Sequence, residues 1–403
     1  MGGEAMMRRI LVAGTADTKG EELAWLRDLL RAGGLVAEIV DLGTRAPTVT
    51  PDVPAEAVAA CHPDGPGFLR SEDRGIAVAA MGAAFANWCR EHSGGIAGVI
   101  AVGGGGGTLI ACAGLRELPY GVPKLMVSTL ASGDTAPYVG TSDIVMMPSV
   151  TDIAGLNRLS RVILSNAAHA LRGMVTAPKP AGNDDKPAIG LTMFGVTTPC
   201  VTAIAAQLRD RYDCLVFHAT GTGGRAMERL LDQRLLSGLI DITTTEIADL
   251  LFGGVLPALS DRLDVVARTG APWVGSVGAL DMVNFWAPAT VPGHYRHRLF
   301  HHHNPNVTLM RTNPDENAAM GRWIADKLNA CAGPLRLLIP ERGLSALDTE
   351  GGSFWWPEPD AALFDSLRRH IANPSRLIFL PCHINDPAFA AAAATTFLDL
   401  MEP

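Results

Sequence analysis

Short apolar runs that alternate with helical patterns are the feature that most constrains the fold of this chain. The apolar run 8–13 ends in a Gly-Thr turn and precedes 21–30, where leucines recur at helical spacing. The same order of strand and helix recurs along the first part of the chain, at 35–41, 96–118 and 124–130. Strands joined through helices lie parallel in one sheet with helices on both faces, so the pattern predicts an α/β fold.

A second series of strands and helices follows a segment rich in proline, glycine and charge. Residues 177–186 have the sequence APKPAGNDDK, which is typical of a linker. Beyond it, strands are expected at 188–194, 214–218, 273–277, 307–311, 336–339 and 377–380. We therefore expect two open Rossmann-like domains with mainly parallel sheets, with ligands bound at the carboxyl ends of the strands and in a cleft between the domains. Their expected bounds are 1–178 and 187–403, with a linker at 179–186.

The composition argues against several classes of partner. The 403 residues include 41 acidic and 33 basic side chains, which gives a formal net charge of −8. A surface that binds nucleic acid or an anionic membrane normally has a basic excess, so neither is expected as a partner. No apolar run is long enough to span a bilayer, and no signal peptide is recognisable. The seven scattered cysteines favour reduced thiols and a cytoplasmic location.

A run of five glycines follows one predicted strand and precedes a helical segment. Residues without a Cβ let backbone N–H groups converge, and the start of the helix adds positive potential. The run therefore predicts a phosphate site formed by Gly103, Gly104, Gly105, Gly106, Gly107 and Thr108, with a flexible turn or a tight crossing as the alternative. No lysine follows the last glycine, which excludes a Walker A loop. No acidic residue lies at the Rossmann spacing, which favours a mononucleotide over a dinucleotide.

Polar residues also follow other predicted strands of the first domain. Asp17 and Lys19 lie directly after the first strand. There the lysine would neutralise phosphate charge, and the carboxylate would hold Mg²⁺ directly or through water. An Asx turn with a solvated lysine is the alternative. Ser132, Gly133 and Thr141 follow two more predicted strands, and such small residues suit phosphate binding as well as turns and caps.

Several longer strings make the chain similar to a known family. They are dense from Ile10 to about Leu400 and include GTADTK at 14–19, GTSD at 140–143 and HATGTGGRAME at 218–228. In these strings the chain resembles the ATP-binding domain family of the tomato mosaic virus resistance protein. The resemblance implies a two-domain α/β protein that binds ATP in its first domain and assembles as a homodimer or higher oligomer.

The resemblance also implies which residues contact the nucleotide. Besides the glycine run with its threonine, these residues are Lys19, Thr44, Ser132, Gly133, Thr141 and Asn166. One departure from the plant member of the family is that this chain has glycine throughout the run, where the plant protein has a serine.

The second domain contains candidate catalytic residues of its own. His218 and Arg225 lie in a glycine-rich segment between a strand and a helix, where the arginine would anchor a carboxylate or phosphate of a substrate. Cys200 lies in the first turn of a predicted helix, a position that favours a thiolate. A small buried apolar side chain is nevertheless the preferred interpretation of this cysteine.

Five of the eleven histidines lie in the segment 294–303. Two or three imidazoles with a nearby carboxylate, such as Asp281 or Asp386, would hold a divalent metal. A solvated basic loop also explains the cluster and is the preferred interpretation. Without a metal, His301 and His383 are candidates for proton transfer near neutral pH.

Together these features predict an ATP-binding cytosolic protein. The first hypothesis is an enzyme in which MgATP in the first domain acts on, or regulates, the conversion of a small anionic metabolite at the second domain. One alternative is an ATP-sensing oligomeric binding protein without turnover. A further alternative is a metal-dependent hydrolase or lyase. The sequence leaves the substrate and the reaction type open.

Overall fold

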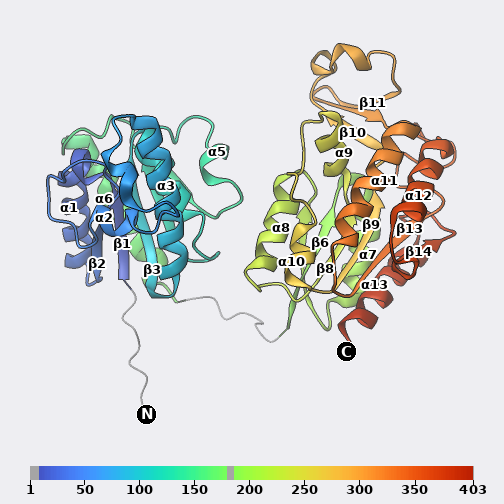
Figure 1. Ribbon diagram of the computed structural model, residues 1–403, viewed down its shortest axis with the longest axis horizontal. Helices are drawn as coiled ribbons and strands as arrows, with labels where there is room; N and C mark the ends of the chain where they lie inside the picture. The colour runs from blue at the N-terminus through green and yellow to red at the C-terminus, as the bar shows by residue number, and fades with distance from the viewer. Residues whose placement is uncertain (1–8, 179–185, 403) are drawn as a thin grey trace. The chain divides into compact units, whose positions relative to one another are not determined.

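Two parallel β-sheets, one in each half of the chain, organise the structure (Figure 1). This computed structural model describes residues 9–178 and 186–402. The chain divides into two units, Met1–Ala181 and Gly182–Pro403. The expected α/β class with two Rossmann-like domains is confirmed. The linker expected at 179–186 lies, apart from Lys186, outside the described residues, and the expected cleft between the domains stays a prediction.

The sheet of the first unit has five parallel strands in the order β2-β1-β3-β4-β5. The chain moves outward to β2 and then returns to the other side of β1, so the strand order reverses between β1 and β3. In open α/β sheets, ligands bind beyond the carboxyl ends of the strands at such a reversal. The strands are β1 (Arg9–Gly14), β2 (Ala37–Asp41), β3 (Ile96–Gly103), β4 (Lys124–Ser128) and β5 (Val145–Pro148).

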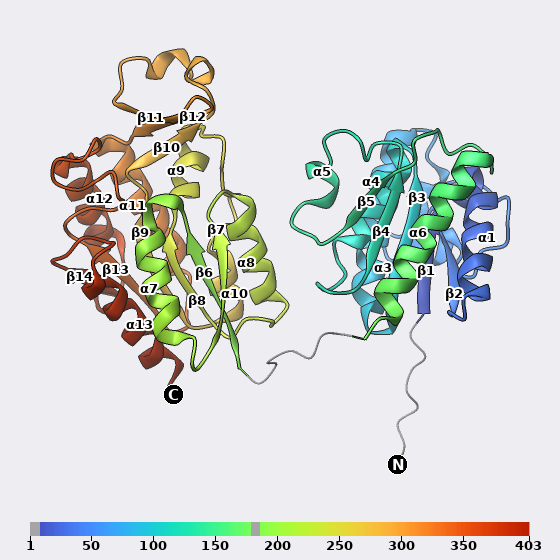
Figure 2. The same ribbon diagram turned by 180° about the vertical axis from the view of Figure 1, so that it is seen from behind.

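Helices cover both faces of this first sheet. One face packs against α1 (Ala16–Ala32) and α6 (Arg158–Thr176), and the other against α2 (Ala55–Ala59), α3 (Arg74–His92) and α4 (Gly105–Leu115). The two faces contribute separate apolar clusters, as expected for strands that are buried on both sides. Figure 2 shows α6 crossing the sheet on the face opposite to α3.

One sequence expectation for this unit is wrong. No strand of the described residues directly precedes Gly140, because Ala136–Val139 forms the short helix α5, and the edge strand β5 follows it instead. Proline at the start of α5 is compatible with the first turn of a helix. Thr141 therefore follows a helix and not a strand. Two short 3-10 helices, η1 (Pro66–Arg70) and η2 (Ser93–Gly95), complete the unit.

The second unit contains six parallel strands in the order β14-β13-β9-β8-β6-β7. The order reverses between β6 and β8. The strands are β6 (Ala188–Met193), β7 (Asp213–His218), β8 (Leu239–Thr243), β9 (Trp273–Gly278), β13 (Leu335–Pro340) and β14 (Leu377–Leu380).

Helices again cover both faces of the second sheet, as Figures 1 and 2 show from opposite sides. One face packs against α7 (Thr198–Leu208) and α13 (Pro387–Met401). The other packs against a larger group of helices, which are α8 (Thr222–Asp232), α9 (Thr245–Phe252), α10 (Asp264–Thr269), α11 (Pro314–Asn329) and α12 (Pro357–His370). Four 3-10 helices lie in the connections, at Gly195–Thr197, Pro288–Thr290, Gly293–Tyr295 and Pro374–Arg376.

A small antiparallel sheet follows β9 and has the order β10-β12-β11. It consists of β10 (Met282–Phe285), β11 (Phe300–Asn304) and β12 (Val307–Arg311). The strand expected at 307–311 is thus confirmed, but it belongs to this antiparallel sheet and not to the parallel one. The part of the histidine segment from His301 to His303 forms a strand where a loop was the preferred interpretation. In the described part of the chain, no helix is long and apolar enough to cross a membrane.

Candidate functional site

The glycine run lies at the reversal of strand order in the first sheet. β3 ends at Gly103, Gly104 is the N-cap, and α4 begins at Gly105. The first helical hydrogen bond runs from the N–H of Thr108 to the carbonyl of Gly104 at 2.8 Å. The N–H groups of Gly105, Gly106 and Gly107 therefore precede the intrahelical ladder, and no side chain of the described residues caps this helix at its N-cap.

Most glycines of the run are not required by the packing of the protein. A Cβ added to Gly104, Gly105, Gly106 or Gly107 would lie 3.8, 4.0, 3.7 and 3.8 Å from its nearest neighbour, which is ordinary contact. None of these four residues has a positive φ. Gly103 differs, because an added Cβ would lie 2.7 Å from the carbonyl carbon of Gly107. Four side chains are thus absent without an internal reason, and their absence leaves the amides open to a ligand.

Thr108 is buried inside this turn. Its hydroxyl oxygen lies 2.6 Å from the hydroxyl oxygen of Ser128 and 3.3 Å from the carbonyl of Gly103. The side chain therefore joins the start of α4 to the end of β4. This geometry gives Thr108 a positioning role at the glycine run.

Two carboxyl groups lie beside the ends of β1 and β2. Asp41 accepts hydrogen bonds from the N–H groups of Ala16 and Gly43 at 2.9 and 2.7 Å. Burial raises the pKa of Asp41, although these two N–H groups oppose the shift and nearby Asp17 adds to it. One carboxylate oxygen of Asp17 is buried and has no hydrogen-bond partner among the described residues. An added Cβ on Gly43 would lie 2.9 Å from Asp41 Oδ1 and 3.1 Å from Asp17 Cγ, so the two carboxyl groups converge.

Lys19 and Thr44 lie close to the same end of the sheet in the chain. The ammonium group of Lys19 donates to the carbonyl of Ile153, in the segment that follows β5. The backbone of Lys19 is not helical (φ −126°, ψ 19°), so α1 is kinked at this residue. Thr44 is half-buried and follows β2 by three residues. The lysine thus connects the segments after β1 and β5.

The remaining residues implied by the resemblance are more dispersed. Ser132 and Gly133 are exposed in the turn after β4, and Thr141 is half-buried and accepts a hydrogen bond from Tyr120 Oη through its carbonyl. Asn166 is exposed in the middle of α6, about 12 Å along the helix axis from its first residue. The structure brings Asp17 and the glycine run to the strand reversal, but it places Asn166 well along a covering helix.

The glycine-rich turn after β7 already binds a carboxylate of the chain itself. The N–H of Gly221 donates to Glu246 Oε2 at 2.7 Å, and an added Cβ on Gly224 would lie 1.9 Å from Glu246 Oε1. Gly221 also has a φ of +78°. Glu246 therefore occupies the position in which an external anion was expected. His218 is exposed beside this turn with its ring 5.2 Å from that of Phe194, and Arg225 is half-buried on α8.

Glu246 belongs to a buried ion cluster that the sequence did not predict. The guanidinium of Arg262 donates to Glu246, Glu228 and Asp241 at 2.7, 2.7 and 2.8 Å. All four residues are buried, and the three carboxylates come from α8, β8 and α9. A charged side chain is almost never buried without a partner, so each of these acidic residues within an apolar context was a local signal for such a cluster.

His383 belongs to a second polar network, at the carboxyl ends of β9, β13 and β14. Its Nε2 lies 2.9 Å from the carbonyl of Ser345, whose hydroxyl donates to Asp281 Oδ2 at 2.8 Å. Asp281 is fully buried, and its Oδ1 has no partner among the described residues. Burial raises the pKa of Asp281 to about 7, and the negative charge of Asp348 adds to the shift.

His301 lies apart from this network, on β11, where its Nδ1 is 3.1 Å from Ser353 Oγ. Within residues 9–178 and 186–402, no group of three His, Cys, Asp or Glu side chains could hold a metal ion. The structure thus does not assemble the hypothetical metal site of histidines with Asp281 or Asp386. It connects His383 to Asp281 through Ser345, and it leaves His218, Arg225 and His301 on separate elements.

Two opposing effects act on the pKa of the Cys200 thiol, the N-terminus of a helix and burial. Cys200 lies in the first turn of α7, where the helix N-terminus favours a thiolate. The side chain is 1% exposed, and burial raises the pKa of Cys200 to about 12. Burial therefore outweighs the helix terminus, and the expectation of a small buried apolar side chain is confirmed.

Known protein families and relatives match almost the whole chain. Residues 8–180 match the "Uncharacterised protein family (UPF0261) N-terminal domain" and residues 186–401 the "Uncharacterised protein family (UPF0261) C-terminal domain". A UPF0261 protein of Rhizobium meliloti (strain 1021) is 62% identical over 400 residues, which cover 98% of this chain and 100% of that protein. The ToMV resistance protein Tm-1(GCR237) of Solanum lycopersicum is 41% identical over 419 residues, which cover 97% of this chain and 56% of the tomato protein. The similarity to the tomato protein is thus confirmed, and the chain belongs to the UPF0261 family.

Proposed function

We propose that this protein binds MgATP at the reversal of strand order in its first domain. The observation that supports this proposal is the glycine run, in which four residues lack side chains although neither packing nor backbone conformation requires it. The N–H groups at the start of α4 that precede its intrahelical hydrogen bonds would bind the phosphate oxygens of the nucleotide.

The carboxyl groups next to this turn suit the magnesium ion that accompanies ATP. Mg²⁺ prefers oxygen ligands and retains several waters, so one or two carboxylates are sufficient protein ligands. Asp17 has a buried oxygen without a described partner, and Asp41 converges with it at Gly43. In this proposal Asp17 would hold the ion directly or through water, and Lys19 would neutralise phosphate charge.

Addition of a methyl group at Gly105 tests the proposal. An added Cβ there lies 4.0 Å from its nearest neighbour, so Gly105→Ala should change the free energy of unfolding by less than about 1 kcal/mol. Contact between the methyl group and the phosphates should weaken MgATP binding at least about tenfold, or about 1.4 kcal/mol. Isothermal titration calorimetry measures the affinity.

The matched control is Gly173→Ala on α6, where an added Cβ meets nothing within 4 Å. This variant should bind MgATP like the parent protein. Absence of MgATP binding to the parent protein, or equal affinity for all three proteins, would contradict the proposal.

For the second domain we propose a small anionic metabolite as substrate or ligand, with Arg225 as anchor and His218, His301 or His383 as proton-transfer groups. The network of His383, Ser345 and buried Asp281 at the carboxyl ends of the strands supports the role of His383 in this proposal. Formation of ADP or AMP with a metabolite panel would distinguish an enzyme from an ATP-sensing binding protein. The homodimer or higher oligomer and the cytoplasmic location stay predictions.

A further inference from the structure

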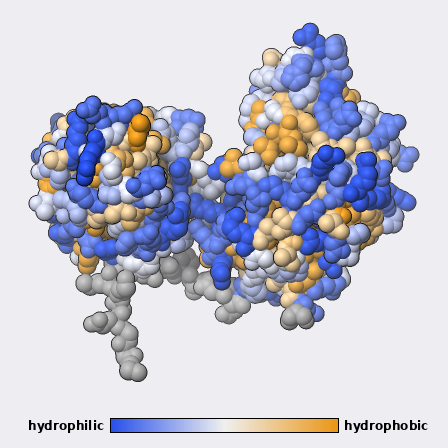
Figure 3. Space-filling view, viewed as in Figure 1, coloured by the Kyte–Doolittle hydropathy of each residue, from blue (hydrophilic) through white to orange (hydrophobic). Residues whose placement is uncertain are grey.

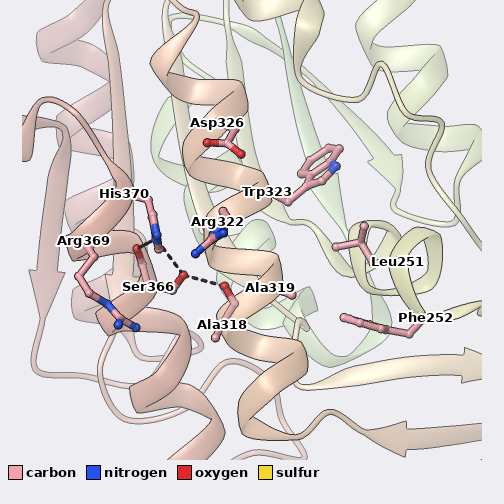
Figure 4. A pocket seen from close by; sticks show the side chains of 10 residues that line it. All are labelled: Leu251, Phe252, Ala318, Ala319, Arg322, Trp323, Asp326, Ser366, Arg369 and His370. Carbon is pink, nitrogen blue, oxygen red and sulfur yellow. Dashed lines mark hydrogen bonds between the residues drawn. The ribbon is translucent and has the colours of Figure 1, made fainter.

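A groove on the helical face of the second domain has walls of two different kinds (Figure 4). It has a volume of about 510 Å³ and lies between the end of α9 and the pair α11 and α12. Its floor is formed where these two helices approach most closely. There, an added Cβ on Gly321 would lie 2.7 Å from Ser366 Cβ, and the hydroxyl of Ser366 donates to the carbonyl of Ala318 at 2.6 Å. The close approach and this hydrogen bond join α11 to α12 at the floor of the groove.

The first wall of the groove is apolar. Leu251 and Phe252 come from the last turn of α9, and Trp323 projects from α11 towards them (Figure 4). All three side chains are half-buried, so part of each faces the groove. Figure 3 shows apolar side chains gathered on the surface around α9. This wall suits an aromatic ring or a branched hydrocarbon.

The second wall is cationic. Arg322 of α11 and Arg369 of α12 are exposed, and neither guanidinium forms an ion pair with a carboxylate of the described residues. His370 Nδ1 lies 2.7 Å from the carbonyl of Ser366. Because a carbonyl can only accept, Nδ1 carries the proton and Nε2 is available to a ligand. Two guanidinium groups and an imidazole thus line one side of the groove.

We propose that this groove binds a small monocarboxylate with an aromatic or branched apolar body. The guanidinium groups would bind the carboxylate in the forked geometry that arginine favours, and Trp323 would contact the apolar body. Asp326 also lines the groove and would repel a second negative charge, which favours a monocarboxylate over a phosphate. The volume lies within the usual range for small-molecule sites, roughly 300–1,000 Å³. This site is independent of the nucleotide site proposed in the first domain.

Calorimetric titration of the full-length protein with phenylacetate tests this proposal. Phenylacetate should bind, and the uncharged phenylacetamide should bind at least about tenfold more weakly because it lacks the carboxylate. Arg322→Gln and Arg369→Gln should each weaken phenylacetate binding about tenfold. Trp323→Ala should also weaken it and should reduce the difference between phenylacetate and smaller carboxylates such as acetate.

Two control variants show whether a loss of binding is specific to the groove or follows from removing any positive charge or any aromatic ring. Arg368→Gln changes the neighbouring arginine, whose guanidinium bonds Asp365 and lies 4.0 Å from the ring centroid of Phe379. Trp286→Ala removes a ring that is 49% exposed and does not line the groove. Both controls should keep the affinity of the parent protein for phenylacetate.

Two outcomes would overturn the proposal. The first is the absence of phenylacetate binding, or binding that Arg322→Gln and Arg369→Gln leave unchanged. The second is that Trp323→Ala forms a smaller assembly than the parent protein in analytical ultracentrifugation, together with no binding of phenylacetate. That second result would identify the groove as a contact between copies of the chain. Far-UV circular dichroism establishes that each variant is folded, so a loss of binding can be assigned to the groove.

Discussion

At the scale of single residues, two buried carboxyl groups of the second domain retain protons near neutral pH. Burial raises the pKa of Asp249 and of Asp281 to about 7 in each case. Asp249 accepts hydrogen bonds from the N–H groups of Asn284 and Leu256, which oppose the shift without cancelling it. The carboxyl group of Asp281 accepts a hydrogen bond from the hydroxyl of Ser345, and its other oxygen has no side-chain partner among the described residues. Both groups therefore link the stability of the fold to pH.

Replacement of Asp281 by asparagine should reduce this pH dependence. The folded-state pKa of about 7 exceeds the unfolded value of 3.8, so the folded protein holds a proton that the unfolded chain has lost. The stabilisation from this proton is complete below about pH 4 and is lost as the pH rises towards 7. As the pH rises from 5 to 7, the free energy of unfolding of the parent protein should fall. The corresponding fall for Asp281→Asn should be smaller by about 1–2 kcal/mol.

Urea unfolding at several pH values measures this effect. The exposed carboxyl group of Asp210 provides the control, and Asp210→Asn should keep the pH dependence of the parent protein. The amide oxygen of the asparagine can still accept from Ser345, which makes the substitution conservative. If the free energy of unfolding depended on pH in the same way for the parent protein and for Asp281→Asn, the carboxyl group of Asp281 would not hold a proton in this pH range.

At the scale of secondary structure elements, the two glycine-rich turns look similar in the sequence but differ in the structure. At the start of α4, an added Cβ on Gly105 would lie 4.0 Å from its nearest neighbour, Leu130 Cδ1, which is ordinary contact. At the start of α8, Gly221 needs a positive φ and Gly224 contacts Glu246, which Arg262 holds in place. Sequence alone cannot distinguish these turns, because the carboxylate that fills the second comes from α9, more than twenty residues further along the chain.

The two turns should therefore respond in opposite ways to alanine. In Gly224→Ala the new Cβ would lie 1.9 Å from Glu246 Oε1 and would displace a buried carboxylate from Arg262. We expect a loss of about 3 kcal/mol or more in the free energy of unfolding, because such a change leaves a buried ion pair incomplete. Gly105→Ala serves as the matched substitution and should be nearly neutral. Equilibrium denaturation in urea compares them, and equal stability of both variants would contradict this account.

At the scale of the whole molecule, the two units have separate apolar cores. The clusters of the first unit involve β1 to β5 with α1 to α4 and α6, and those of the second involve the later strands and helices. Each unit therefore has its own source of stability. The proposed nucleotide site involves only the first unit.

We expect MgATP to stabilise the first unit selectively. At a concentration of about one hundred times its Kd, a ligand stabilises the fold by about 2.7 kcal/mol. For a unit of this size that raises the midpoint of unfolding by about 5–10 °C. Differential scanning calorimetry should show a shift of one transition, and Gly105→Ala should reduce it. A shift of equal size in every transition would contradict selective binding to the first unit.

Local apolar periodicity was sufficient to predict the α/β class, most strands and helices such as α3, because these signals need only neighbouring residues. It missed β8, in which Asp241 interrupts an otherwise apolar segment, and it misplaced the strand before Gly140. Tertiary structure alone decided the strand orders, the partners of Arg262 and the groove between α11 and α12. Each of these depends on contacts between residues far apart in the chain. No local pattern specifies which distant residue will pair with a buried charge, or whether a distant side chain will fill the space beside a glycine.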